Sequence, residues 1–150
     1  MRQGRPAGWR AAITIQFMRL EMPKIRVSNP DKRASTGSYS DAVLIDGWLY
    51  ISGQGPLDLG TGEVVHGTIE EETRRTLEHI GSILKAADMS FHDIVKCTCH
   101  ISDIDDFERF DSIYREFFSG ILPARTTVQS VLGGIKVEID AIARVSPKAG

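Results

Sequence analysis

The sequence predicts an α/β (α+β) fold in one domain, a mixed β-sheet with two helices on one face. Two kinds of segment predict it, apolar strand segments and amphipathic helical segments, in the order strand, strand, helix, strand, helix, strand, strand. The composition of the 150 residues, 41% hydrophobic and 25% charged, is that of a soluble globular protein. Because no third helix is predicted for the other sheet face, we expect homo-oligomerisation with closed cyclic symmetry to cover it.

The N-terminal segment differs from the rest of the chain. Residues 1–20 carry four Arg and no acidic residue, which is typical of a mitochondrial presequence, although Ser is absent. Met18 and Met22 are alternative start positions. We therefore expect residues 1–23 to be an extension that is disordered or upstream of the true start, and the domain to span 24–148. The expected location is the cytoplasm, or the mitochondrion if residues 1–20 are a presequence.

The first strands come before a glycine-rich loop. Residues 24–27 alternate as a short strand, and segments 42–45 and 48–51 flank Asp46-Gly47, a pair typical of a type I′ hairpin turn. Residues 52–62 follow, but they lack the glycine and lysine order of a phosphate-binding loop. Their glycines either permit tight turns or let the backbone at 52–53 approach a ligand closely.

Two helices are predicted by capping signals and apolar stripes. Residues 68–71 have the spacing of a capping box, and we interpret the acidic trio 70–72 as capping and solvation rather than metal binding. The stripe of this helix is Thr73, Leu77, Ile80, Leu84 and Ala87. Residues 105–108 cap the second helix, Gly120 and Pro123 end it, and its stripe is Phe107, Phe110, Tyr114 and Phe117.

The strand at 94–101 holds both cysteines. Cys97 and Cys99 alternate onto one face and His100 onto the other, so we expect buried free thiols rather than a disulfide or a metal site. A formal charge of -2 and a pI near 6.1 predict no nucleic-acid partner. No apolar run reaches the ~20 residues of a membrane span, so no membrane partner is expected.

The most informative residues are Arg125, at the start of a β-branched strand, and Glu138, inside the next one. An Arg fork grips a carboxylate through two parallel hydrogen bonds, and a Glu among apolar neighbours suits proton transfer. A simple hairpin about Gly133-Gly134 would leave the two about 13 Å apart. Either the strands are not paired or a second subunit completes the site. The alternative is a surface ion-pair Arg and a solvent-facing Glu.

The motifs taken together resemble the RidA (YjgF) family of reactive-intermediate deaminases over about residues 24–146. They are residues 37–43 (GSYSDAV), 50–54 (YISGQ), 61–62 (TG), 93–96 (DIVK), 123–125 (PAR) and 137–139 (VEI). The resemblance implies a chorismate-mutase-like fold, a homotrimer, and ligand sites in the clefts between subunits. It also implies that the last strand inserts beside earlier ones.

The resemblance further implies an activity without metal or cofactor, the hydrolysis of 2-imino and enamino acids such as 2-aminoacrylate or 2-iminopropionate to 2-oxo acids and ammonia. Arg125 then corresponds to the carboxylate clamp, and Glu138 to the group that orients water or relays its proton. Tyr39 would wall the cleft, and Ser52 and Gly53 would line it.

Several positions depart from the family pattern. Thr127 stands where deaminases often have Cys, Asp111 where they often have Asn, and Ser38 where Pro is usual, and segment 129–136 is about two residues shorter. An ionised Asp111 near the cleft would repel an anionic substrate or favour one with a cationic group. A non-catalytic carboxylate-binding module and a deaminase of 2-aminomuconate are therefore alternatives, whereas the balanced charge argues against a ribonuclease.

Overall fold

The computed structural model describes residues 23–145, which form one sheet and two α-helices. The elements are β1 (Ile25–Val27), β2 (Ala42–Ile45), β3 (Trp48–Gln54), α1 (Ile69–Ala86), β4 (Ile94–Ile101), α2 (Phe107–Glu116), β5 (Ala124–Gln129) and β6 (Val137–Arg144). The predicted extension lies outside the described residues, except for Pro23. Among residues 23–145, no helix is long and apolar enough to cross a membrane.

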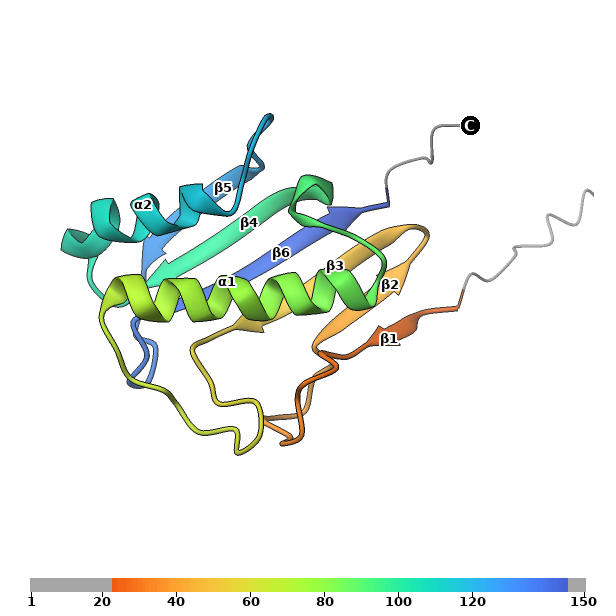
Figure 1. Cartoon of the computed structure of the whole chain (residues 1–150), viewed down its shortest axis with the longest axis horizontal. Coiled ribbons are helices and arrows are strands. Elements are labelled where there is room, and N and C mark those ends of the chain that lie inside the picture. Colours follow the sequence, from red (N-terminus) through yellow and green to blue (C-terminus); the bar gives the residue numbers. More distant parts are fainter. Residues whose placement is uncertain (1–22, 146–150) are drawn as a thin grey trace, which may run out of the picture.

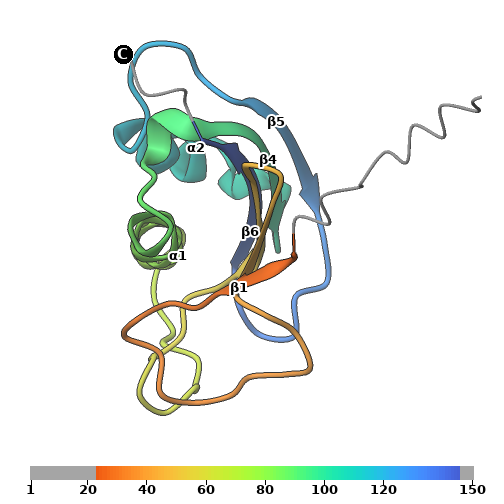
Figure 2. The same cartoon turned by 90° about the vertical axis from the view of Figure 1, so that its right-hand side faces the viewer.

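The sheet has the strand order β1-β2-β3-β6-β4-β5 (Figure 1). Every neighbouring pair is antiparallel except β4 and β5, which are parallel and joined through α2. Both α-helices cover the same face of the curved sheet, as the side view makes plain (Figure 2). The predicted mixed sheet with two helices on one face is therefore confirmed. The opposite face is here called the helix-free face.

The last two strands do not pair with each other. β4 lies between them, so that Cys97 is in register with Arg125 of β5 on one side and with Ala141 of β6 on the other. Of the two explanations offered for the distance between Arg125 and Glu138, the unpaired strands are confirmed. β6 is a central strand because it also pairs with β3.

The local signals of the hairpin and of the first helix are both confirmed. Asp46 and Gly47 have φ angles of 51° and 77°, the two positive values that a type I′ turn requires. Thr68 caps α1 by accepting a hydrogen bond from the Glu71 amide at 3.2 Å, and the Glu71 carboxylate accepts one from the Thr68 amide at 2.8 Å. This reciprocal capping box begins the helix where the sequence predicts it.

The acidic trio does not behave as one solvated group, which corrects the prediction. Glu71 caps the helix and the partly exposed Glu70 pairs with Arg109, but the Glu72 side chain is only 1% exposed. Its carboxylate accepts hydrogen bonds from the Gly67 amide at 3.2 Å and from the Lys136 amide at 2.6 Å. Glu72 thus ties the segment before β6 to α1.

The start of the second helix also differs in detail. Asp103, not the predicted Asp105-Asp106 pair, makes the side-chain cap, accepting from the Asp105 amide at 2.9 Å at the start of a short 3₁₀ turn. Asp106 instead pairs with Arg109 one turn along α2. The predicted stripe packs as expected, with Phe110 fully buried and Tyr114 nearly so.

The core lies between the sheet and the helices, and both cysteines are in it. Cys97 and Cys99 are free and completely buried. Burial raises the pKa of both thiols, that of Cys99 to about 12. The prediction of buried thiols on one face of the strand is confirmed.

Candidate active site

Arg125 lies on the helix-covered face at the start of β5, which is an edge strand. Its guanidinium carbon is 4.6 Å from the ring centre of Tyr114, 5.5 Å from that of Phe107 and 5.6 Å from that of Phe110. Cations are attracted to the faces of aromatic rings at such distances. The three rings, all on α2, therefore hold the guanidinium in place, and the Arg125 side chain is 20% exposed.

Asp111 holds the same guanidinium from a second direction. One Asp111 carboxylate oxygen lies 2.6 Å from an Arg125 nitrogen, and the other lies 3.4 Å from a nitrogen of Arg115. All three residues line an open cavity of about 410 Å³ with Leu122 and Pro123. The two Arg charges compensate the Asp111 charge, so the cavity keeps a net positive charge from these three groups. An arginine with one nitrogen engaged still has other N–H groups to offer an anion.

Thr127 follows Arg125 on the same face, two residues along β5, and is in register with Cys99. Its hydroxyl is buried and has no hydrogen-bond partner among the described residues. A buried polar atom without a partner carries a free-energy cost, and a bound ligand is one way to relieve it. Thr127 is therefore an unpartnered polar group on the same face as Arg125.

Glu138 lies on the other side of the sheet. Its neighbours Val137 and Ile139 are completely buried under the helices, so alternation directs the Glu138 side chain to the helix-free face. There it packs over Gly53 of β3, where an added Cβ would lie 2.7 Å from Glu138 Oε1. Gly53 is thus a contact of the glutamate, and its lack of a side chain gives the carboxylate its space.

The other predicted lining residues make local contacts. The Ser52 hydroxyl donates to the Ser40 carbonyl at 2.6 Å, and the Tyr39 hydroxyl is hydrogen-bonded to Thr36. The Tyr39 side chain, 48% exposed, lines a polar cavity of about 200 Å³ with the loop that carries it, and Lys32 lies over its ring at 5.1 Å. The Tyr39 side chain is therefore available to a neighbouring molecule, whereas Ser52 supports the loop that carries Tyr39 and Ser40.

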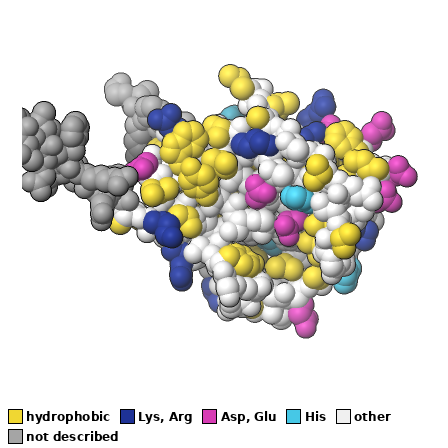
Figure 3. Space-filling model, turned by 180° about the vertical axis from the view of Figure 1, so that it is seen from behind, with side chains coloured by type: hydrophobic (Ala, Val, Ile, Leu, Met, Phe, Trp, Pro, Cys, Tyr) yellow, Lys and Arg dark blue, Asp and Glu magenta, His cyan; other side chains and the backbone are white. Residues whose placement is uncertain are grey.

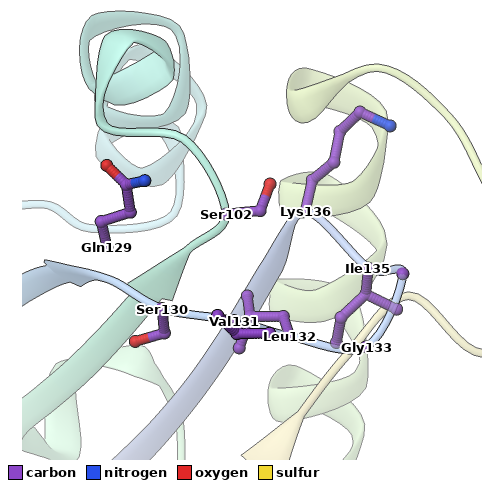
Figure 4. A pocket seen from close by; sticks show the side chains of 9 residues that line it. Ser102, Gln129, Ser130, Val131, Leu132, Gly133, Ile135 and Lys136 are labelled. Atoms are coloured by element: carbon purple, nitrogen blue, oxygen red, sulfur yellow. The ribbon is translucent and has the colours of Figure 1, made fainter.

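The structure divides the predicted site residues between two faces. Arg125, Thr127 and Asp111 are on the helix-covered side of the sheet, and Glu138 and Gly53 are on the helix-free side. A ligand small enough for an Arg clamp cannot touch both groups in one chain. A cavity of about 760 Å³ at the loop between β5 and β6 contains none of these residues (Figure 4).

An aromatic floor under Arg125, formed by the rings of Phe107, Phe110 and Tyr114, was not predicted from the sequence. The stripe Phe107, Phe110 and Tyr114 was interpreted only as a packing face, although all three rings contact the guanidinium. Burial raises the pKa of Tyr114, which therefore presents a neutral hydroxyl. The aromatic stripe is visible in the sequence. Its position under Arg125 follows only from the parallel crossover from β4 through α2 to β5.

Comparison with known proteins now identifies the family. The sequence model of the family described as Endoribonuclease L-PSP matches residues 30–145. The chain belongs to this family, the RidA (YjgF) family. The chain is 41% identical over 123 residues to the 2-iminobutanoate/2-iminopropanoate deaminase of Rattus norvegicus. The aligned region covers 81% of this chain and 90% of the rat protein.

Solved structures of similar proteins have the same fold. A putative endoribonuclease from Thermotoga maritima superposes with a TM-score of 0.77 at 37% identity, covering 83% of this chain and all of that one. TdcF from E. coli, solved with bound serine, superposes with a TM-score of 0.75 at 31% identity, covering 82% of this chain and all of that one. The RidA fold predicted from the motifs is confirmed.

Proposed function

We propose that this RidA-family chain hydrolyses 2-imino acids to 2-oxo acids and ammonia. The observation that carries the proposal is Arg125, a guanidinium held by three aromatic rings and Asp111 at the mouth of an open cavity. Such a group binds a small carboxylate. The name of the rat relative, a 2-iminobutanoate/2-iminopropanoate deaminase, and the serine bound to E. coli TdcF support a ligand of this size and charge.

We further propose that the site is formed between copies of the chain in a homotrimer. Arg125 and Glu138 lie on opposite faces of one sheet, so the glutamate that serves a given arginine would come from a neighbouring copy. The helix-free face supports this arrangement, because three large hydrophobic residues on it are between 39% and 46% exposed to solvent: Tyr50, Val95 and Val128. Figure 3 shows hydrophobic side chains around a centre of acidic and histidine side chains on this face.

In the proposed reaction, the substrate carboxylate accepts hydrogen bonds from the Arg125 nitrogens that Asp111 leaves available. Glu138 of the neighbouring copy accepts a proton from a water molecule as its oxygen adds to the imine carbon. Glu138 then returns this proton to the nitrogen of the tetrahedral adduct. The carbon–nitrogen bond breaks as the proton of the new hydroxyl group moves to the departing nitrogen, so that ammonia and the 2-oxo acid leave. An imine carbon is already electrophilic, so positioning and proton transfer are the contributions required of the protein.

The test is to generate 2-aminoacrylate from serine with a dehydratase and to follow pyruvate release. The wild type should accelerate release, and Arg125→Ala should abolish the acceleration, with Arg74→Ala as a matched surface control. An unchanged rate with the wild type, or full activity in Arg125→Ala, would contradict the proposal. Tight binding of a 2-oxo acid without turnover would instead indicate a carboxylate-binding module.

A ribonuclease is the second candidate, because the description of the matching family names an endoribonuclease. The net charge of -2 opposes it, since RNA binding relies on a concentration of cationic side chains. RNA cleavage that persists through purification and is lost in Glu138→Gln would support this candidate. Cleavage that is unchanged in that variant would indicate a contaminant.

A further inference from the structure

His100 is the direct neighbour of Glu138 on the helix-free face. The two residues are paired in register between β4 and β6, and both alternate away from the buried side of their strands. Side chains in such cross-strand pairs have Cβ atoms about 4.5–5.5 Å apart. The imidazole ring is therefore within reach of the carboxylate that the proposed reaction uses.

One nitrogen of the ring has a fixed partner. His100 Nδ1 lies 2.8 Å from the hydroxyl of Ser130, the residue that follows β5. The Ser130 amide donates to the Ile101 carbonyl at 2.9 Å, which holds the serine against β4. Figure 4 shows the Ser130 and Gln129 side chains pointing to opposite sides of the strand. With Nδ1 engaged, Nε2 is the nitrogen left to interact with Glu138.

The other charged groups near the ring are few. On β6, Glu138 lies opposite it and Asp140 two residues further on, and β5 contributes the apolar Val128. On β4 itself, Lys96 is on the same face, but its ammonium group donates to the Thr126 hydroxyl at 3.0 Å and to the Cys97 carbonyl at 2.9 Å. His100 therefore faces two carboxylates, and the Lys96 ammonium group on the same face is held by other partners.

We propose that His100 is a positioning residue for Glu138, a role that rests on the proposed function. Ser130 holds Nδ1 of the His100 ring. When Nε2 carries a proton, the ring donates a hydrogen bond from Nε2 to the Glu138 carboxylate. This hydrogen bond orients the carboxylate toward the water molecule. Imidazole changes charge in the range between about pH 5 and 8, so the proton acceptor is ordered in a pH-dependent way.

The contact is tested without turnover by nuclear magnetic resonance titration of the histidine rings. His100 signals are assigned with His100→Gln, since the chain has four histidines. In Glu138→Gln the His100 titration should move to lower pH, because a neighbouring negative charge is lost. Asp31→Asn is a matched control with the same charge change elsewhere. An identical titration in Glu138→Gln and the wild type would overturn the contact.

The role is tested by the pH dependence of kcat/KM for 2-aminoacrylate hydrolysis. His100→Gln should lower kcat/KM about tenfold at the wild-type optimum, the effect of one lost hydrogen bond to a charged group, and should remove one limb of the profile. Ser130→Ala should give a smaller change in the same direction. An active wild type with an unchanged profile in His100→Gln would overturn the role of His100, whereas an inactive wild type would overturn the proposed function.

Discussion

Replacing Asp111 by Asn should tighten substrate binding. The Asp111 carboxylate lies 2.6 Å from an Arg125 nitrogen, in the same cavity that would receive the substrate carboxylate. Two carboxylates on one guanidinium group repel each other, so Asp111 orients Arg125 at the expense of affinity for an anion. Asn has nearly the same shape and an amide oxygen that can still accept from Arg125, but no charge.

The magnitude follows from Coulomb's law. Two carboxylates on adjacent nitrogens of a guanidinium group are about 6 Å apart, which corresponds to about 3 kcal/mol at an effective dielectric constant of 20 and about 0.7 kcal/mol in water. The side chains of Arg125 and Asp111 are 20% and 25% exposed, so solvent screens part of the repulsion. We expect about 1 kcal/mol, which is about a fivefold lower KM.

The assay is steady-state hydrolysis of enzymatically generated 2-aminoacrylate, with calorimetric binding of pyruvate as a second readout. Asp111→Asn should lower KM and the pyruvate Kd together, with little change in kcat. Asp106→Asn is the matched control, because it removes a charge from the start of α2 that pairs with Arg109 outside the cavity. An unchanged or higher KM in Asp111→Asn, or the same decrease in Asp106→Asn, would refute the reasoning.

Three further predictions concern other parts of the fold. Gly53→Ala places a Cβ 2.7 Å from Glu138 Oε1 and should reduce kcat at least tenfold while unfolding in urea is nearly unchanged; full activity would show that the carboxylate position is unimportant. Glu72→Ala leaves two backbone N–H groups unpaired and should lower the free energy of unfolding in urea by about 2–3 kcal/mol. Glu72→Gln should lower it by less, and an equal decrease in the two variants would contradict the account. Burial raises the pKa of Cys99 to about 12 from an ordinary value near 9, so the folded state retains a proton that the unfolded state loses. The free energy of unfolding should therefore fall as pH rises from about 9 to 12, and fall less in Cys99→Ala; equal slopes would contradict it.

The parts of the fold that local sequence could predict are those with local causes. The turn at Asp46-Gly47 depends on two positive φ angles, and the start of α1 depends on a capping box of four residues. Each signal lies within a few residues of the structure it determines. The buried carboxylate of Glu72 was missed because its partner, the Lys136 amide, is 64 residues away.

The candidate site was predicted in its residues but not in its arrangement. Arg125 and Glu138 were selected by residue type and by resemblance to a family, and neither signal states on which face a side chain lies. The position of Arg125 relative to Glu138 depends on the insertion of β4 between β5 and β6, a pairing between segments far apart in the chain. The aromatic floor of Arg125 depends in the same way on the crossover through α2.

Subunit complementation tests the central claim, that each site takes Arg125 from one copy and Glu138 from another. Arg125→Ala and Glu138→Gln are each expected to be inactive, and they are unfolded together in equal amounts and refolded. In a cyclic trimer with random mixing, about a quarter of the sites would join an intact Arg125 to an intact Glu138, so about a quarter of wild-type activity should return. If both groups acted within one chain, every chain in the mixture would lack one of them. No recovery of activity in mixed trimers, with both variants folded, would contradict the account.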